Sequence, residues 1–89
     1  MPSKKVTLIN KLGLHARAAA RLVQEASSFE SEINIKYSDK EVSGKSIMGV
    51  MMLAAALGST IEIIANGKDE DEALDRLEQL ILDKFGEEK

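Results

Sequence analysis

The sequence predicts an α+β fold, an open-faced β-sandwich in which a four-stranded, mainly antiparallel sheet carries three helices on one face in the order βαββαβα. Two observations lead to this class. Segments with alternating apolar and polar residues are interleaved with segments whose apolar residues recur at helical spacing. Two of the alternating segments are also joined by a two-residue turn, which makes them an antiparallel hairpin. We therefore expect helices to cover one face of the sheet and to leave the other comparatively open.

The first half of the chain contains three of the expected strands and the first helix. Residues 6–9 alternate and are rich in β-branched side chains, which is typical of a strand. Apolar residues at helical spacing then predict a helix over about residues 16–27. Residues 31–37 alternate strictly, and a Ser-Asp turn leads into a shorter strand around Lys40 to Ser43.

A short apolar helix is expected to begin after Ser46, which is a suitable N-cap, to run through Met52 or further, and to end before Gly58. One group of its apolar residues falls in a narrow angular sector and should be buried: Val50, Leu53 and Leu57. A second group spreads over the flank and the opposite side, where exposed members would form a docking patch: Ile47, Met48, Met51 and Met52. A helix buried all round is the alternative.

The last part of the chain adds one strand and one long helix. Residues 60–65 alternate again and form the fourth strand. Asp69, with Glu72 three residues on, forms a variant of the capping box at the start of a long amphipathic helix. Gly86 is expected to stop this helix, because glycine commonly follows a helix C-terminus.

Composition predicts a single domain over residues 1–89 that folds as a monomer and works through a surface site. The chain has no cysteine and one histidine, which excludes disulfide scaffolds, thiol nucleophiles and multi-histidine metal sites, so we expect no metal and no cofactor. The N-terminal residues do not resemble a signal peptide, and the longest uncharged stretch is too short for a membrane span. We expect a cytoplasmic protein that does not insert into membranes.

Charge is distributed unevenly, although the formal net charge is only −3. Five basic residues precede the first acidic residue, Glu25, whereas residues 69–89 are strongly acidic. A basic N-terminal segment attracts anions or acidic protein surfaces. Nucleic acid is the weaker interpretation, because no aromatic residue lies in the basic segment to stack on bases.

The only histidine, His15, stands at the expected start of the first helix, with Arg17 two residues on. A helix N-terminus presents backbone N–H groups and the positive end of the helix dipole, so with a guanidinium it forms a ready site for a phosphate dianion. The imidazole could cap the helix and offer one ring nitrogen as a nucleophile. A surface histidine without function is the alternative, and Gly13 could be no more than a flexible turn.

Ser46 follows Gly44 and Lys45, a triplet that superficially resembles a nucleotide-binding loop. The pattern fails because Asp39 stands where such a loop requires its first glycine. Ser46 is therefore interpreted first as an N-cap, with a regulated phosphorylation site as the alternative. Phosphate at this position would be compatible with the helix but would alter the approach of an acidic partner.

Two motifs together resemble a known family. Gly13-Leu14-His15-Ala16-Arg17 and Lys45-Ser46-Ile47-Met48-Gly49-Val50-Met51 are similar to segments of HPr, the histidine-containing phosphocarrier protein of the bacterial phosphoenolpyruvate-dependent phosphotransferase system. The resemblance extends over essentially the whole chain, including Gly67-Lys68-Asp69-Glu70 at the entry to the last helix.

The resemblance implies a stoichiometric phosphoryl carrier and not an enzyme. His15 would accept a phosphoryl group at Nδ1 from phospho-enzyme I, which phosphoenolpyruvate charges, and would donate it to a histidine of a IIA protein or domain. Arg17 would help to hold the phosphate. HPr kinase/phosphorylase, where an organism has it, would phosphorylate Ser46 and hinder transfer at His15. The residues expected to dock partners are Ala20, Arg21, Ile47, Met48, Met51 and Met52.

Three positions depart from the usual family pattern. Ala18 stands where many members have proline, so the helix is expected to form with a slightly less rigid start. Gln24 and Ser27 are neutral where members often carry further bases. Docking of enzyme I is therefore expected to be weaker or differently tuned.

Three other functions remain in competition. A nitrogen-type regulatory phosphocarrier would use the same histidine but would pass the phosphoryl group to a regulatory IIA protein and not to a sugar permease. A small α+β interaction module would make His15 incidental. A hydrolase fits worst, because nothing indicates the second ordered pocket that a Ser-His-acid arrangement needs.

Overall fold

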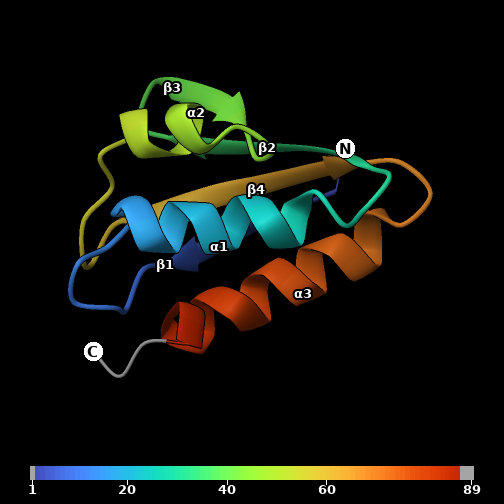
Figure 1. Cartoon of the computed structure of the whole chain (residues 1–89). Helices are drawn as coiled ribbons and strands as arrows, with labels where there is room; N and C mark the ends of the chain where they lie inside the picture. Colours follow the sequence, from blue (N-terminus) through green and yellow to red (C-terminus); the bar gives the residue numbers. More distant parts are fainter. Residues whose placement is uncertain (1, 87–89) are drawn as a thin grey trace.

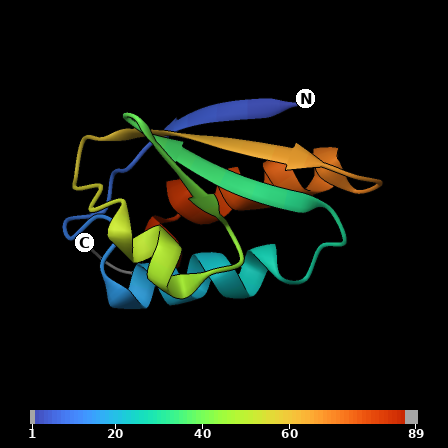
Figure 2. The ribbon, with the colours of Figure 1, turned by 90° about the horizontal axis from the view of Figure 1, so that it is seen from above.

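The computed structural model describes residues 2–86, in which four strands form one antiparallel sheet with the spatial order β1-β4-β2-β3. The elements in chain order are β1 (Ser3–Thr7), α1 (Ala16–Ala26), β2 (Glu32–Tyr37), β3 (Lys40–Ser43), α2 (Ile47–Met52), β4 (Thr60–Asn66), α3 (Glu70–Leu82) and a 3₁₀ turn, η1 (Lys84–Gly86). The three α-helices lie on one face of the sheet (Figure 1, Figure 2). The predicted fold class and order of elements are confirmed.

The first strand begins and ends earlier than the alternation of the sequence predicts. β1 pairs with β4 from Ser3 to Thr7, and this partner sets its bounds in place of residues 6–9. Leu8 nevertheless points inward and is fully buried. Alternation therefore identified the inward face correctly. It could not locate the ends of the strand, because these depend on the pairing partner.

The chain leaves α2 through a left-handed residue, but not through the one expected. The helix ends at Met52 and so before Gly58, as predicted, but the left-handed residue that first follows it is Ala54, with a φ of 53°, and not Gly58. The turn brings Ala55 against the loop before α1, where its carbonyl oxygen accepts the N–H of Leu14 at 2.9 Å. Leu57 was predicted to be buried but is 56 % exposed, because helical spacing no longer applies beyond α2.

The core lies between the sheet and the helices. The strands contribute their inward-facing residues, and α1 and α3 contribute their apolar stripes. The turn η1 adds Phe85, which closes the core after α3. No helix within residues 2–86 has the length and apolar character to cross a membrane. The largest fully buried apolar side chains are Phe85, Leu8, Leu22, Ile33, Ile35, Leu53, Ile61, Ile63, Leu77 and Ile81.

The uncovered face of the sheet carries a row of alternating charges. The strand register places Lys5 beside Glu62 and Glu62 beside Lys36. Lys36 in turn stands beside Glu41, so the row crosses all four strands. Opposite charges on neighbouring strands favour this register, because each side chain faces an attractive neighbour.

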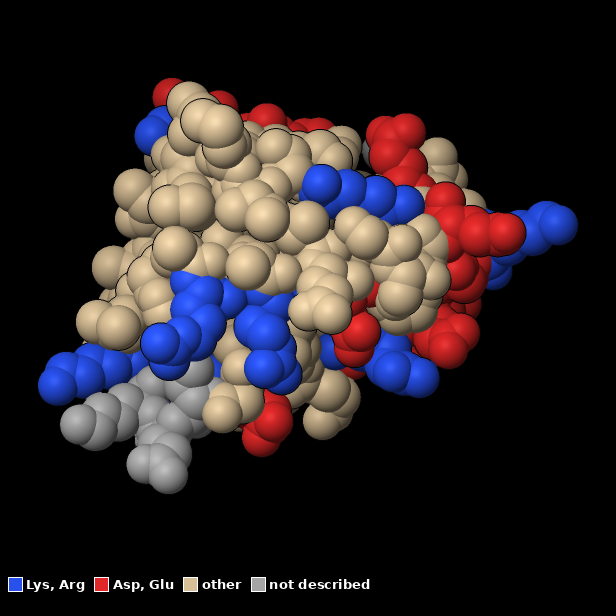
Figure 3. All heavy atoms as spheres, viewed as in Figure 1, with Lys and Arg blue, Asp and Glu red and all other residues tan. Residues whose placement is uncertain are grey.

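On the helix-bearing side, basic and acidic side chains gather in different places. Figure 3 shows basic side chains over the first half of α1 and acidic side chains where α3 begins. The first turn of α3 holds Glu70, Asp71 and Glu72, at the helix end where negative charge is favourable. The exposed bases on α1 are Arg17 and Arg21. The uneven charge of the sequence therefore becomes a basic area at the start of α1.

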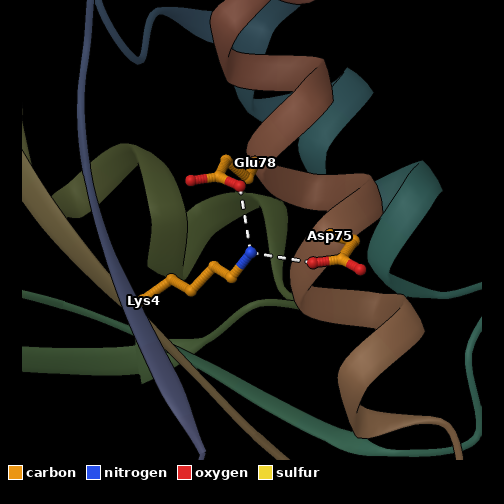
Figure 4. A network of polar contacts seen from close by, with 3 residues as sticks. All are labelled: Lys4, Asp75 and Glu78. Carbon is orange, nitrogen blue, oxygen red and sulfur yellow. Dashed lines mark hydrogen bonds and ion pairs between the residues drawn. The ribbon is translucent and has the colours of Figure 1, made fainter.

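A lysine on the edge strand connects α3 to the sheet (Figure 4). Lys4 Nζ lies 2.8 Å from Asp75 Oδ1 and 3.0 Å from Glu78 Oε1. Both hydrogen bonds raise the pKa of Lys4, and the bond to Asp75 has the larger effect. The two carboxylates reach one ammonium because residues three apart share a helix face. The contact orients α3 over β1, but its exposure to water limits its contribution to stability.

Asp69 is the N-cap of α3, but its side chain connects the helix to the loop before β2 and makes no capping hydrogen bond. Its carboxylate accepts the N–H of Glu30 and the N–H of Ser31, each at 2.9 Å, and also the Ser31 hydroxyl. The start of α3 is instead closed by Glu70, whose carboxylate accepts the N–H of Gly67 at 3.0 Å. The predicted helix start at Asp69 is therefore confirmed, but the capping box is wrong, since a distant loop supplies the hydrogen-bond donors of the Asp69 carboxylate.

Asp69→Asn is expected to lower stability at neutral pH, and the loss is expected to disappear in acid. The Ser31 hydroxyl, followed by the N–H of Glu30, lowers the pKa of Asp69 from its ordinary value of 3.8. Such a group contributes stability that is present above the unfolded pKa and is lost as the pH falls through the folded pKa. Denaturant unfolding of both proteins from neutral pH down to about pH 2.5 measures the difference.

The control for this measurement is Asp39→Asn, the same chemical change in the exposed turn between β2 and β3. The two variants are expected to differ in their pH profiles of stability. If Asp69→Asn and the wild type differed by the same amount at every pH, the hydrogen bonds of the Asp69 carboxylate would not be the source of the effect.

Candidate functional site

The structure places His15 at the N-cap of α1, where the loop from β1 ends. Its backbone is extended, with φ −73° and ψ 178°, and its carbonyl oxygen accepts the N–H of Ala19 at 2.8 Å, the first hydrogen bond of the helix. The residue is half-buried. Its imidazole makes no capping hydrogen bond to α1, so the expectation that the ring caps the helix is wrong. The predicted position at the helix start is confirmed.

Gly13 is required by the close approach of two backbone segments. It adopts a φ of 61°, in the left-handed region. A Cβ at Gly13 would lie 2.5 Å from the carbonyl oxygen of Ala55 and 2.7 Å from Cα of Ala56. Leu14 donates its N–H to that same Ala55 oxygen. The loop before His15 is therefore packed onto the segment that follows α2, and Gly13 is more than a flexible turn.

Arg17 lies in the first turn of α1, two residues after the N-cap, and its side chain is exposed. The first turn contains no acidic residue. A guanidinium and the positive end of a helix dipole both attract anions, so the start of α1 has the charge to hold one. The basic area of Figure 3 lies over this part of the helix. The arrangement suits a doubly charged phosphoryl group attached to the imidazole.

Replacement of the usual proline by Ala18 leaves the start of α1 helical. The helix begins at Ala16, and Ala18 is fully buried within the core. Alanine has the most favourable helix propensity, so this position needs no proline to remain helical. The expectation that the helix forms is confirmed.

Ser46 is the N-cap of α2, as the sequence predicts. Its backbone is extended, and its Oγ accepts the N–H of Gly49 at 3.0 Å. Its neighbour Lys45 is engaged elsewhere, because its Nζ donates to the carbonyl oxygen of Phe29 at 2.8 Å. The Ser46 hydroxyl therefore has a structural role at the start of α2, independent of any modification.

Ser46→Ala is expected to lower the free energy of unfolding by about 1 kcal/mol, because it removes the N-cap acceptor. Ser46→Asp keeps an acceptor at this position and should recover most of the loss. Urea unfolding followed by circular dichroism measures both. Equal losses in the two variants would show that the hydrogen bond to Gly49 is not what Ser46 contributes.

The remaining predicted site residues are exposed on α1 and α2, which pack side by side. Ala20 and Arg21 lie one turn beyond Arg17. The guanidinium of Arg21 lies close to η1, because a Cβ built at Gly86 would lie 3.2 Å from a terminal nitrogen of Arg21. The outward residues of α2, here called the α2 apolar patch, are exposed by 44 % at Ile47, 74 % at Met48, 42 % at Met51 and 68 % at Met52.

The exposure of the α2 apolar patch excludes the alternative of a helix buried all round. Only Val50 is buried within α2 itself, and Leu53 follows it as the buried C-cap. In Figure 3 an uncharged area borders the basic side chains of α1. An apolar area beside a basic one is thus available on the side of the molecule that carries α1, and its role in docking stays a prediction.

Asn10 is the residue near His15 that the sequence analysis missed. It is fully buried, and its Nδ2 donates to the carbonyl oxygen of Gly13 at 2.8 Å. A polar residue in a loop carries no periodic signal of burial, so no pattern in the sequence could have found it. Within residues 2–86, no group of three or more His, Cys, Asp or Glu side chains is placed to hold a metal ion.

The chain matches one family model and several curated relatives. The model described as "PTS HPr component phosphorylation site" matches residues 2–83. Phosphocarrier protein HPr of Cupriavidus necator is 52 % identical over 87 residues, which cover 98 % of each chain. Phosphocarrier protein NPr of Shewanella violacea is 45 % identical over 84 residues, which cover 94 % of this chain and 92 % of the relative.

Solved structures of high similarity share the fold. HPr-C-His from Thermoanaerobacter tengcongensis superposes with a TM-score of 0.95 at 46 % identity, and the match covers 100 % of both chains. A second structure from that organism, described as an HPr dimer, gives a TM-score of 0.78 at 46 % identity and covers 98 % of this chain and 100 % of that one.

Proposed function

Because the chain belongs to the HPr family, the phosphocarrier proteins of the phosphotransferase system, we propose that His15 is the residue that carries the phosphoryl group. His15 accepts the group from phospho-enzyme I, which phosphoenolpyruvate charges, and donates it to a histidine on a IIA protein or domain. One observation carries this assignment: His15 is the N-cap of α1, and Arg17 lies in a first turn that has no acid. The protein is then a stoichiometric carrier and not an enzyme.

In the proposed transfer, Nδ1 of His15 attacks phosphorus. The imidazole lone pair forms the new P–N bond, and the donor on enzyme I keeps the electron pair of the bond that breaks. The transferred group carries about two negative charges near neutral pH. Arg17 and the N–H groups at the start of α1 neutralise this charge. The second transfer repeats the same step, with a histidine of the IIA protein as the attacking group.

Partners dock, in this proposal, on the exposed side of α1 and on the α2 apolar patch. Ala20 and Arg21 extend the basic area beyond Arg17, and the patch supplies apolar contact beside it. This combination fits a partner surface with an apolar centre and acidic groups around it. Flexible methionine side chains can adapt to more than one partner, as a carrier between two proteins requires. Because Gln24 and Ser27 are neutral, the electrostatic attraction of an acidic partner depends on the remaining basic residues.

Ser46 is a second point of control in this proposal, in organisms that have HPr kinase/phosphorylase. Phosphorylation adds nearly two negative charges at the start of α2, directly before the α2 apolar patch. The added charge repels an acidic docking surface and so hinders transfer at His15. The phosphate oxygens can still accept the N–H of Gly49, so α2 is expected to persist.

The experiment that tests the carrier function uses the purified protein, phosphoenolpyruvate and the enzyme I of the same organism. Intact-mass measurement and site mapping are expected to find one acid-labile phosphoryl group on His15. Addition of a IIA protein is expected to remove it. If cognate enzyme I leaves the protein unlabelled, the carrier function fails and the α+β interaction module becomes the better reading.

A regulatory, nitrogen-type phosphocarrier is the second candidate, and the similarity to a protein named NPr favours keeping it. It uses the same chemistry at His15 but a different acceptor. Transfer rates to the IIA domain of a sugar permease and to a regulatory IIA protein, measured side by side, separate the two pathways. Faster transfer to the regulatory protein would favour this second candidate.

We also propose that the carrier acts as a cytoplasmic monomer. A monomer leaves α1 and the α2 apolar patch accessible to both partners. The related HPr described as a dimer makes the oligomeric state a necessary measurement. Sedimentation at several protein concentrations is expected to give a single species of the monomer mass, 9.7 kDa.

A further inference from the structure

Two polar side chains are almost completely buried within residues 2–86, Asn10 and Ser31. They lie beyond opposite ends of α1, because Asn10 precedes the helix start and Ser31 follows the helix end. The 11 residues of α1 lie between them in the chain, and a helix of this number of residues is about 16 Å long. The Ser31 hydroxyl serves the contact with Asp69, far from the candidate site. Asn10 serves the loop that leads into His15.

Asn10 holds the peptide group between Gly13 and Leu14. Its Nδ2 donates to the oxygen of this peptide at 2.8 Å. The N–H of the same peptide belongs to Leu14 and donates to the carbonyl oxygen of Ala55 at 2.9 Å. Both polar ends of the peptide plane are therefore held, one by a side chain and one by the segment after α2. The main-chain oxygen of Asn10 also accepts the N–H of Gly13, at 3.2 Å.

We propose that Asn10 is a positioning residue for phosphoryl transfer, acting through the backbone of His15; this inference rests on the proposed function. A glycine permits its neighbouring peptide planes to rotate at low cost, so the plane after Gly13 needs an external contact to keep one orientation. Burial strengthens that contact, because water does not compete for the amide. The peptide plane sets the direction in which the chain enters the N-cap of α1.

Loss of the Asn10 amide affects the reaction and not the docking. A rotated Gly13–Leu14 peptide displaces His15, whose Nδ1 must meet the phosphorus atom in line with the leaving group. A displacement of about 1 Å at a reacting group can slow a reaction roughly 100-fold. The proposed docking residues on α1 and the α2 apolar patch are not part of this loop. A change at Asn10 is therefore expected to act on kcat and to leave KM nearly constant.

Steady-state transfer from phospho-enzyme I, measured as a function of carrier concentration, tests the proposal. Asn10→Leu removes the amide and keeps the branched shape and the number of side-chain heavy atoms, and Ser31→Ala is the control, because it also removes a buried polar group. At a temperature where both variants are folded by circular dichroism, Asn10→Leu is expected to lower kcat at least about tenfold with KM within about twofold. Ser31→Ala is expected to retain both values. Asn10→Ala replaces the leucine variant if that side chain does not fit.

Amide hydrogen exchange of Leu14, followed by NMR, provides a measurement that does not depend on phosphoryl transfer. Its protection is expected to fall at least about tenfold in Asn10→Leu relative to the wild type, and to stay unchanged in Ser31→Ala. If the wild type accepts no phosphoryl group, the proposed function fails, and the exchange result still shows whether Asn10 holds the loop.

Three results would overturn the positioning role. The first is an unchanged kcat in a folded Asn10 variant, whatever the exchange of Leu14. The second is a loss that appears in KM alone, which would make Asn10 part of partner binding. The third is an equal fall of kcat in Ser31→Ala, which would trace the effect to general stability and not to the Gly13–Leu14 peptide.

Discussion

His15→Ala is expected to abolish phosphoryl acceptance completely and to leave the fold intact. His15 is the only histidine in the chain, and its imidazole is the proposed nucleophile. Its removal is expected to cost little stability, because the residue is half-buried at the surface and is not part of the hydrophobic core. Intact mass after incubation with phosphoenolpyruvate and enzyme I measures acceptance, and circular dichroism measures the fold.

A second variant, His15→Asn, separates the chemistry of the ring from the structure of the N-cap. Asparagine is among the preferred N-cap residues, so α1 should begin as in the wild type or more firmly. Its amide cannot form a phosphohistidine, so acceptance should again be zero. An acid-labile phosphoryl group on either variant would contradict the assignment of His15, as would an unfolded His15→Ala protein.

Arg17→Ala is expected to slow phosphoryl acceptance by more than tenfold without loss of the fold. The exposed guanidinium contributes nothing to the core, so the free energy of unfolding should change by less than about 0.5 kcal/mol. A charge-assisted hydrogen bond to the phosphoryl group is worth about 1.5–3 kcal/mol, which corresponds to roughly tenfold or more in rate. Rapid-quench measurement of labelling by phospho-enzyme I gives the rate directly.

The matched control is Arg76→Ala, which makes the same change in net charge at an exposed arginine of α3. Arg76 lies 3.9 Å from Glu25, near the end of α1 opposite to His15. Its variant is expected to retain the wild-type rate. A similar slowing in both variants would attribute the effect to long-range attraction of enzyme I, and an unchanged rate in Arg17→Ala would refute a phosphate contact.

Arg17→Lys distinguishes charge from geometry at the same position. Lysine keeps the positive charge but lacks the planar pair of donors that a guanidinium offers to two phosphate oxygens. An intermediate rate is therefore expected. Full activity of Arg17→Lys would show that the charge alone assists the transfer.

Local periodicity was sufficient for most of the architecture. The hairpin strand at Lys40–Ser43 and the helix start at Ala16 lie where alternation and helical spacing place them. The position of His15 at the end of a helix follows from the same reasoning, as does the N-cap at Ser46. These features depend on residues that are near each other in the chain, and a pattern of residues can therefore encode them.

Several of the wrong predictions share one cause, because contacts with a segment far away in the chain replaced the contacts that the local sequence favoured. Asp69 binds the loop before β2 and not its own helix. Ala54 already turns the chain in a left-handed conformation four residues before Gly58, and Leu57 is consequently exposed. In each case the local preference was reasonable, but packing between segments offered better hydrogen bonds or better burial.

The amino-acid order alone therefore establishes the class of fold and the place of His15 and Arg17 at the start of the first helix, whereas the exposure of the α2 apolar patch was decided by the structure. The three-dimensional packing adds the close approach of Gly13 to Ala55, the buried amide of Asn10 in the loop before His15 and the row of alternating charges across the sheet. Contacts of this second kind join residues that are far apart in the chain, and their energy depends on distances that exist only after the core has formed.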